Sequence, residues 1–328
     1  MNWFREYLTN ISIRRLIPSN SDRSSVFVWI TITTLAIIFT AYKIVVEWHQ
    51  TQQISLHVNF YHLLIGFGIY SVSLLLTASC WALIIGFFSG RRVFWNHVRI
   101  FCLTNVAQRL PTPIPYIVAR TEIYARQNLS RNTVLTAMAV EVTITLCSAL
   151  IVVLLTIPFM HSFYDSIEVA LLSVSIILLS APLIFIKAIT SILGRLSYPL
   201  LSIMPDVRYI LVWIAIFSFI WVNSGVLHYA LISSFFTIPM ETLPALICTS
   251  AISGIVGWMS QILFFLPTPA IRQLTMIYLL NIYFPMPLAV ASTIFIRICI
   301  MVFELIWAGI FLTIPSNKEF LHTSGDKQ

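Results

Sequence analysis

Six charged side chains of this 328-residue chain lie within or beside long apolar runs, where an ionisable group is costly unless it is paired or functional. They are Arg109, Arg120, Glu141, Arg272, Arg297 and Glu304. An acid and a base in such surroundings can form a structural ion pair, or they can line a polar cavity that receives a charged group. A carboxylate there can also act as a general base.

Two of these residues, Glu141 and Arg297, lie deep inside their apolar runs. Each follows the start of its run by about ten residues, which in a helix corresponds to about 15 Å, near the middle of a bilayer. Two interpretations stay open: an ion pair between Glu141 and Arg297, or two groups that line a cavity for a charged headgroup. Glu304 lies almost two helical turns beyond Arg297, so it either continues this polar track or snorkels to the interface.

The composition indicates the environment of these charges. Hydrophobic residues make up 59% of the chain and charged residues 9%, and the mean hydropathy is +0.91, which a single soluble core cannot accommodate. We therefore predict an all-α polytopic membrane protein. The formal charge of +7 does not indicate nucleic-acid binding, because the basic residues lie between apolar runs, where membrane topology explains them.

The apolar runs predict about six full membrane spans and two proline-broken hairpins. The expected spans are 26–46, 60–88, 133–157, 167–186, 209–236 and 288–314. Two further apolar stretches, 98–127 and 243–283, each contain the sequence Leu-Pro-Thr-Pro, with Pro111 and Pro113 in the first and Pro267 and Pro269 in the second. Because proline removes a backbone donor and clashes with the preceding turn, we expect each stretch to form two half-helices.

The basic residues between the runs predict the topology. If each hairpin returns to its own side, every basic cluster falls on one face, and the positive-inside rule places both termini in the cytoplasm. We therefore expect a multi-pass protein of the cell inner (plasma) membrane. It would have a basic cytoplasmic segment at 1–25, a single transmembrane domain at 26–315 and a cytoplasmic tail at 316–328.

Several short motifs recur and predict an internal repeat. Leu-Pro-Thr-Pro occurs twice, an arginine follows each copy, and the sequence Thr-Ile-Pro ends the next apolar run at 156–158 and again at 313–315. The expected units are about 60–158 and 209–315. Three spans separate the hairpins, so the copies would be inverted, as is typical of secondary transporters.

The arginines beside the hairpin joints suggest a ligand. Half-helix N-termini direct backbone N–H groups into the membrane, and a guanidinium binds phosphate through two parallel hydrogen bonds, so Arg109, Arg120 and Arg272 suit a phosphate-bearing headgroup. The alternative is that they anchor the hairpins at the interface. The sequence has no Gly-rich phosphate loop, no nucleophile elbow and no metal-ligand spacing among its five cysteines, so we assign no catalytic residue, metal or cofactor.

The two hairpins and their following spans resemble the flippase-like transmembrane domain of lysylphosphatidylglycerol synthases and its stand-alone relatives. The residues that carry the resemblance are NVAQRLPTPIPYIVARTEIYARQNLSRNTVLTAMAVEVTITL and FFLPTPAIRQLTMIYLLNIYFPMPLAVASTIFIRICIMVFELIWAG. The resemblance implies that corresponding site residues are Pro111, Arg120 and Glu141 in the first unit and Pro267, Arg272 and Arg297 in the second.

The sequence also departs from that family. Glycines usually follow the family's joint proline, whereas Thr112 and Pro113 stand there in the first unit and Thr268 and Pro269 in the second, and proline supplies no backbone donor. The family's soluble aminoacyl-transferring domain has no counterpart in this sequence, so lysyl-lipid synthesis is not implied. The resemblance implies a membrane lipid or a lipid-linked saccharide as the partner.

Three functions therefore remain as hypotheses. The leading one is binding and translocation of a lipid or lipid-linked headgroup, in a glycolipid, phospholipid or surface-polysaccharide pathway. The second is a membrane-embedded glycosyl- or phospho-transferase in which Glu141 and Glu304 act as base and charge stabiliser. The third is a non-catalytic membrane subunit that anchors a soluble biosynthetic enzyme.

Overall fold

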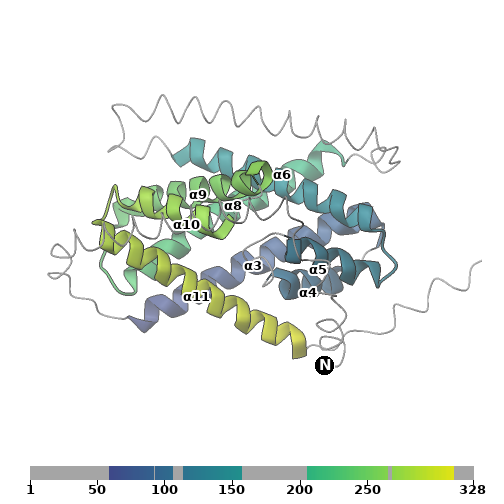
Figure 1. The fold of residues 1–328 in the computed structure, drawn as a ribbon, viewed down its shortest axis with the longest axis horizontal. Coiled ribbons are helices and arrows are strands. Elements are labelled where there is room, and N and C mark those ends of the chain that lie inside the picture. The colour runs from purple at the N-terminus through teal and green to yellow at the C-terminus, as the bar shows by residue number, and fades with distance from the viewer. Residues whose placement is uncertain (1–58, 92, 106–113, 157–204, 265–267, 314–328) are drawn as a thin grey trace, which may run out of the picture. The chain divides into compact units, whose positions relative to one another are not determined.

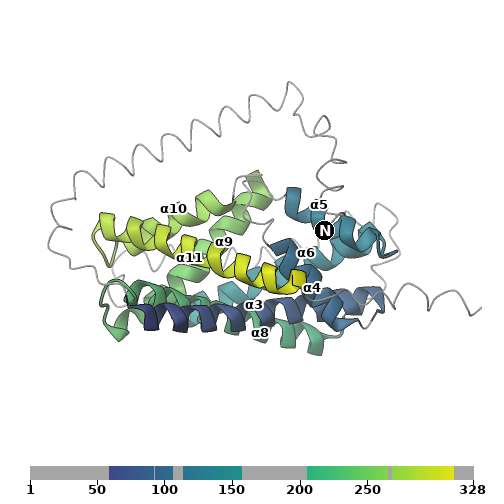
Figure 2. The same ribbon diagram turned by 90° about the horizontal axis from the view of Figure 1, so that it is seen from below.

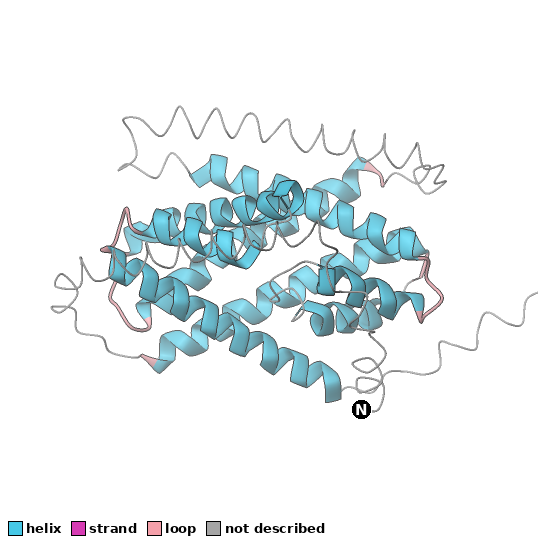
Figure 3. Ribbon diagram, viewed as in Figure 1, coloured by secondary structure: helices cyan, strands magenta, loops and turns pink. Residues whose placement is uncertain are grey.

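The computed structural model describes residues 59–91, 93–105, 114–156, 205–264 and 268–313. Within these residues the regular structure is helical throughout, with no strand (Figure 3). All of them belong to the compact unit Gln50–Gln328, and the other unit, Met1–His49, lies outside the described residues. The all-α prediction is therefore confirmed for the part of the chain that the structure describes.

A first group of helices precedes the undescribed segment 157–204 (Figure 1). We call it the first helix group, and it contains α3 (Phe60–Ser89), α4 (Phe94–Asn105), α5 (Ile114–Ala125) and α6 (Arg131–Thr156). The side chain of Asn59 caps the start of α3 by accepting a hydrogen bond from the Tyr61 amide, and Gly90, with φ of 66°, ends the helix in a left-handed conformation. The Ser130 hydroxyl caps α6 by accepting a hydrogen bond from the Thr133 amide at 3.1 Å.

A second group of helices follows that segment. This second helix group contains α8 (Val207–Ser233), the short 3₁₀ helix η6 (Met240–Thr242), α9 (Leu243–Phe264), α10 (Thr268–Leu280) and α11 (Met286–Thr313). The Asp206 side chain accepts a hydrogen bond from the Arg208 amide at the start of α8. Pro269 and Pro287 are each the second residue of their helices, α10 and α11, where the missing N–H is not needed.

Within the described residues, five helices are long and apolar enough to cross a membrane. They are Phe60–Ser89, Arg131–Thr156, Val207–Ser233, Met240–Ser260 and Met286–Thr313. Four of the six expected spans, 60–88, 133–157, 209–236 and 288–314, therefore coincide with long apolar helices. The other two expected spans, 26–46 and 167–186, lie outside the described residues.

The two proline-containing stretches each form two separate helices, but the second stretch differs from the prediction. The helices α4 and α5 have 12 residues each, or about 18 Å, which is half a bilayer. In contrast, α9 has 22 residues, or about 33 Å, and is itself long enough to span. No proline interrupts the 22 residues between Pro244 and Pro267, so one helix can run through them, whereas α4 begins only at Phe94, after Gly90 has ended α3.

The helices α3 and α8 form the most extensive helix–helix contact. They run antiparallel and lie side by side in Figure 2. At one end of the pair the rings of Phe87 and Tyr209 lie 6.0 Å apart, and at the other end the Asn59 amide donates to the Ser234 carbonyl at 2.6 Å. Midway, the Asn223 amide group donates to the Ser73 hydroxyl at 2.7 Å. Apolar packing and interhelical hydrogen bonds therefore join the two helix groups along the whole length of this pair.

Contacts between the two helix groups are reciprocal. The last helix of the first group, α6, packs against α8 and α9 of the second group, and the last helix of the second group, α11, packs against α3 and α4 of the first. Within each group the neighbours also correspond, because α3 contacts α4 and α6 as α8 contacts α9 and α11. Each group therefore uses its last helix to cover the first two helices of the other.

Candidate functional site

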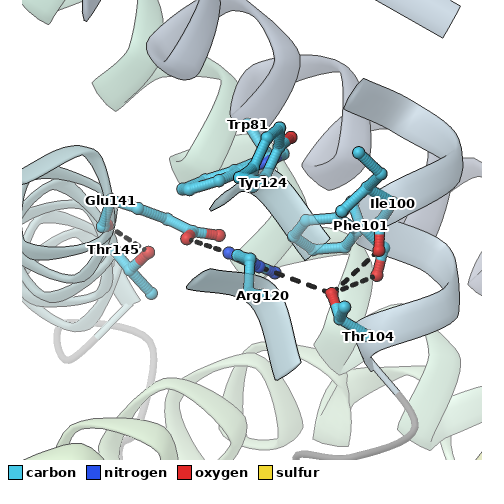
Figure 4. A network of polar contacts seen from close by, with 8 residues as sticks. All are labelled: Trp81, Ile100, Phe101, Thr104, Arg120, Tyr124, Glu141 and Thr145. Carbon is cyan, nitrogen blue, oxygen red and sulfur yellow. Dashed lines mark hydrogen bonds and ion pairs between the residues drawn. The ribbon is translucent and has the colours of Figure 1, made fainter. Parts of the chain in front are cut away.

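The arginine of the first hairpin, Arg120, lies at the centre of the first helix group (Figure 4). Its side chain is completely buried, with 0% of its surface exposed. Each of the four helices contributes a neighbour: Trp81 from α3, Phe101 and Thr104 from α4, Tyr116 from α5 and Glu141 from α6. The site therefore exists only where the hairpin docks between α3 and α6.

Two polar groups hold the guanidinium of Arg120. Its Nη1 atom donates to Oε2 of Glu141 at 2.8 Å, and its Nε atom donates to the Thr104 hydroxyl oxygen at 3.4 Å. The Thr104 hydroxyl donates its own hydrogen to the carbonyls of Ile100 and Phe101, so its oxygen is free to accept from Arg120. Among the described residues, the Nη2 atom of Arg120 has no hydrogen-bond partner.

Three aromatic rings complete the surroundings of Arg120. The guanidinium carbon lies 4.1 Å from the ring centre of Trp81, 4.4 Å from that of Tyr116 and 4.7 Å from that of Phe101. Each distance is within the range of a cation–π interaction, which is stronger when the cation is desolvated. We call these three rings, together with the Glu141 carboxylate, the aromatic cage of Arg120.

The aromatic cage explains how a full charge is accommodated inside the helix group. A buried guanidinium needs a paired anion, and Glu141 supplies it from a helix long enough to span the membrane. One of the two interpretations of the sequence paired Glu141 with Arg297, whereas the ion pair that Glu141 forms in the structure is with Arg120. The physical reason is that α5 packs directly against α6 and brings Arg120 there, whereas α11 packs against α3, α4, α8 and α10.

A second chain of hydrogen bonds extends from the aromatic cage to the end of α3. The indole N–H of Trp81 donates to the Tyr124 hydroxyl at 3.0 Å, and that hydroxyl lies 3.1 Å from Nδ1 of His97. The other ring nitrogen of His97, Nε2, lies 3.3 Å from the Arg91 carbonyl. One assignment satisfies all three bonds: Tyr124 donates to Nδ1, and a neutral His97 donates from Nε2 to the carbonyl.

The environment of His97 favours this neutral ring. His97 lies on the short helix α4, outside the five spanning helices, and it is buried. Burial lowers its pKa below the usual value, the positive charge of Arg91 lowers it further, and the hydrogen bond to the Arg91 carbonyl opposes both effects. The chain from Trp81 to Arg91 therefore holds one tautomer of His97.

From the sequence, we assigned no role to Trp81, Tyr116, Tyr124 or His97. A signal was nevertheless present, since Tyr116, Arg120 and Tyr124 are spaced by four residues and lie on one face of α5. Tyr116 contributes to the cage and Tyr124 to the hydrogen-bond chain. The spacing therefore indicated that aromatic side chains flank this arginine on its own helix.

Glu304 also contacts the first hairpin. Its side chain is buried on α11, and its Oε1 atom accepts a hydrogen bond from the Asn105 side chain at 3.0 Å. Nearby, Arg99 donates from Nε to the Phe311 carbonyl at 3.1 Å. Because Thr104 accepts from Arg120 and the adjacent Asn105 donates to Glu304, the last turn of α4 is bonded to one buried charged residue of each helix group.

The second helix group carries a related but looser arrangement. The guanidinium carbon of Arg272 on α10 lies 6.0 Å from the ring centre of Trp221 on α8. The corresponding pair in the first helix group is Arg120 on α5 and Trp81 on α3, which are 4.1 Å apart. Trp221 in turn donates from its indole N–H to the Thr145 carbonyl at 3.0 Å. Arg272 is partly exposed, in contrast to Arg120.

The remaining predicted residues are placed as follows. Arg297 lies on α11, partly buried, and Pro269 lies in the first turn of α10. Arg109, Pro111, Pro113 and Pro267 lie outside the described residues. No group of His, Cys, Asp and Glu side chains within the described ranges is arranged to hold a metal ion.

Comparison of the chain with protein-family models and with curated proteins finds no match. The resemblance to the flippase-like domain therefore stays a prediction. What the helices establish is an all-helical chain with several segments able to span a membrane, consistent with an integral membrane protein.

Proposed function

We propose that this integral membrane protein binds an anionic lipid headgroup through its second helix group and moves the lipid between the two leaflets. The observation that carries the proposal is a difference in charge between corresponding positions of the two helix groups. In the first group a buried arginine is neutralised by a buried carboxylate. In the second group a basic residue, Arg297, follows the start of the last helix by nearly the same number of residues as that carboxylate does.

The correspondence of the two groups has support from both order and packing. Each group consists of a long helix, two helices on either side of a Leu-Pro-Thr-Pro sequence, and a second long helix. The contacts between the groups are reciprocal, as expected for two copies of one unit. If the two groups form an inverted repeat, as we propose, one unit can rock against the other around a central ligand.

Corresponding residues can then be compared. Arg120 and Arg272 both lie in the first turns of the helix after the joint, and both lie over a tryptophan of the first long helix. Glu141 follows the first residue of α6 by ten positions, and Arg297 follows the first residue of α11 by eleven. At these two positions the first unit has one acid and one base, whereas the second has two bases; the buried carboxylate of the second unit, Glu304, lies seven residues beyond Arg297.

This charge difference favours an anionic ligand. In the first unit, the Glu141 carboxylate marks the place of an anion relative to the arginine and the tryptophan. In the second unit, a phosphate group supplied by a ligand would take the corresponding place, where guanidinium groups bind it through two hydrogen bonds. A ligand with acyl chains suits the surroundings, because α8 and α11 expose large apolar side chains along their lengths.

The proposal is tested by reconstituting the full chain in liposomes that contain labelled anionic or zwitterionic phospholipids, or polyprenyl-linked sugars. We expect transbilayer movement of anionic lipids, reduced at least about tenfold by Arg272→Gln and by Arg297→Gln, since a charge-assisted hydrogen bond contributes about 1.5 to 3 kcal/mol. Arg131→Gln is the matched control, because that arginine is exposed and pairs only with Glu122 among the described residues. Absence of lipid movement across the whole panel would contradict the proposal.

A further inference from the structure

Trp221 is a buried residue of α8 whose side chain lies against three other helices. Only 7% of its surface is exposed. Its indole N–H donates to the Thr145 carbonyl of α6 at 3.0 Å, and its ring packs directly against Gly254 of α9. The guanidinium carbon of Arg272, on α10, lies 6.0 Å from the ring centre. Trp221 therefore connects the first helix group to an arginine of the proposed ligand site.

Two of these contacts fix the position of the indole ring. A methyl group added at Gly254 would overlap the six-membered part of the ring, so α9 lies directly against it. The hydrogen bond to the Thr145 carbonyl holds the N–H edge, and Thr145 lies one turn beyond Glu141 on α6. The ring cannot rotate without losing this hydrogen bond or overlapping α9. Trp221 is thus a rigid surface for a side chain that lies against it.

The first helix group contains the same arrangement around Trp81. The indole N–H of Trp81 donates to the Tyr124 hydroxyl at 3.0 Å, and its ring centre lies 4.1 Å from the guanidinium carbon of Arg120. In both groups, a tryptophan of the first long helix is held through its N–H and lies beside the arginine that follows Leu-Pro-Thr-Pro. In the first group this arginine is held where it pairs with a carboxylate, Glu141.

We infer that Trp221 is a positioning residue, which holds the guanidinium of Arg272 where it binds the phosphate group of the ligand. The inference rests on the proposed function and adds to it the residue that places the binding arginine. A cation–π contact attracts a guanidinium to an aromatic ring without using its N–H groups, which bind phosphate oxygens in pairs. Because Trp221 is hydrogen-bonded to α6, the first helix group then fixes the position of a binding residue in the second.

The experiment uses the full chain in detergent and measures equilibrium binding of three probes. These are a short-chain phosphatidic acid, the matching diacylglycerol, which lacks phosphate, and inorganic phosphate. Trp221→Leu, which removes the aromatic ring, and Trp221→Phe, which keeps a ring but removes the N–H, are each measured in the wild type and in Arg272→Gln. The unfolding temperature of every variant is measured in parallel.

We expect the wild type to bind phosphatidic acid and not diacylglycerol. Trp221→Leu should weaken this binding about three- to tenfold, as expected for the loss of a partly desolvated cation–π contact, and Trp221→Phe should weaken it less. In the Arg272→Gln background, neither change at Trp221 should weaken the residual binding further, because Trp221 acts through Arg272. A residue that only stabilises the fold would weaken binding equally in both backgrounds.

Trp213 provides the matched control. It lies two turns before Trp221 on the same helix, only 2% of its surface is exposed, and its ring lies beside those of Phe87 and Tyr209. Trp213→Leu should therefore lower the unfolding temperature and leave the affinity for phosphatidic acid unchanged. Loss of affinity in Trp221→Leu would then not reflect the loss of a buried tryptophan as such.

The remaining outcomes separate the inference from the proposed function. If both Trp221 variants bind phosphatidic acid like the wild type, or if they weaken binding equally with and without Arg272, Trp221 does not position Arg272, while the proposed function stands. If the wild type binds inorganic phosphate with this dependence on Trp221 but does not bind phosphatidic acid, the inference stands and the lipid function fails. If the wild type binds neither probe, both are overturned.

Discussion

The guanidinium of Arg120 and the carboxylate of Glu141 lie 2.8 Å apart on neighbouring helices, in surroundings that leave the arginine no exposed surface. Three aromatic rings cover the faces of the guanidinium that the carboxylate does not reach. This contact joins the first hairpin to a long apolar helix.

Replacing either partner alone should strongly destabilise the protein. Arg120→Leu or Glu141→Leu leaves one uncompensated buried charge, which costs about 3 to 5 kcal/mol, whereas the double replacement should recover most of that loss. Thermal unfolding of the purified variants in detergent measures the difference. The exposed pair Arg131–Glu122 is the control, because its removal should cost no more than about 1 kcal/mol. A double variant as unstable as the single ones would mean that the pair does not act as a unit.

Stability should depend on pH through His97. Burial lowers the pKa of folded His97 below the value of about 6.5 of the unfolded chain. Between these two values the unfolded chain binds more protons than the folded protein, so stability should fall as the pH drops below about 6.5. Unfolding temperatures measured from about pH 5 to pH 7 test this expectation.

Two variants test whether His97 causes this dependence of stability on pH. His97→Gln should have a flatter pH profile, because it cannot take up the proton. Tyr124→Phe keeps the imidazole but removes the hydroxyl that binds Nδ1 and Trp81, so it should be less stable by about 1 to 3 kcal/mol and still show a pH slope. Equal slopes in the wild type and in His97→Gln would assign the dependence to other groups.

The contact between Asn105 and Glu304 should couple the first hairpin to the last helix. A double-mutant cycle with Asn105→Leu and Glu304→Leu should give an interaction energy of about 1 to 3 kcal/mol, because each single change leaves the other buried polar group with one fewer hydrogen bond. Glu304→Gln keeps an acceptor oxygen and should lose much less. Additive effects of the two leucine substitutions would show that the contact carries no energy of its own.

The ends of the antiparallel pair α3 and α8 predict which residues label from which side of the membrane. Arg91 follows the end of α3, where Phe87 meets Tyr209, and Glu241 follows the end of α8, where Ser234 meets Asn59. Cysteines at positions 91 and 241 should therefore react with impermeant reagents from opposite sides, with position 91 cytoplasmic under the positive-inside rule. Labelling of both positions from one side would exclude the expected topology.

The long helices were predictable because length and hydropathy are properties of a continuous segment. The runs 60–88 and 209–236, for example, correspond within a few residues to α3 and α8. The proline positions likewise predicted where α4 and α5 separate. The length of α9 was missed because symmetry with the first hairpin was given more weight than its own unbroken run before Pro267.

The partner of Glu141 could not be predicted in the same way. The rise per residue gives the depth of a side chain in the membrane but not its direction around the helix or the identity of the neighbouring helix. Arg297 has the expected depth in its run, but Arg120 is the arginine that the packing of α5 against α6 brings to Glu141. Only the tertiary arrangement distinguishes the two arginines.

The contact between α8 and α9 has a mechanical consequence. A methyl group added at Gly225 would overlap the backbone of Ile247, and one added at Gly254 would overlap the Trp221 ring, so these helices touch at two levels with no spare room. Neither helix can slide along the other or turn about its axis without a clash. We therefore expect α8 and α9 to move together as one rigid pair. Any change in the arrangement of the second helix group would then consist of movements of α10 and α11.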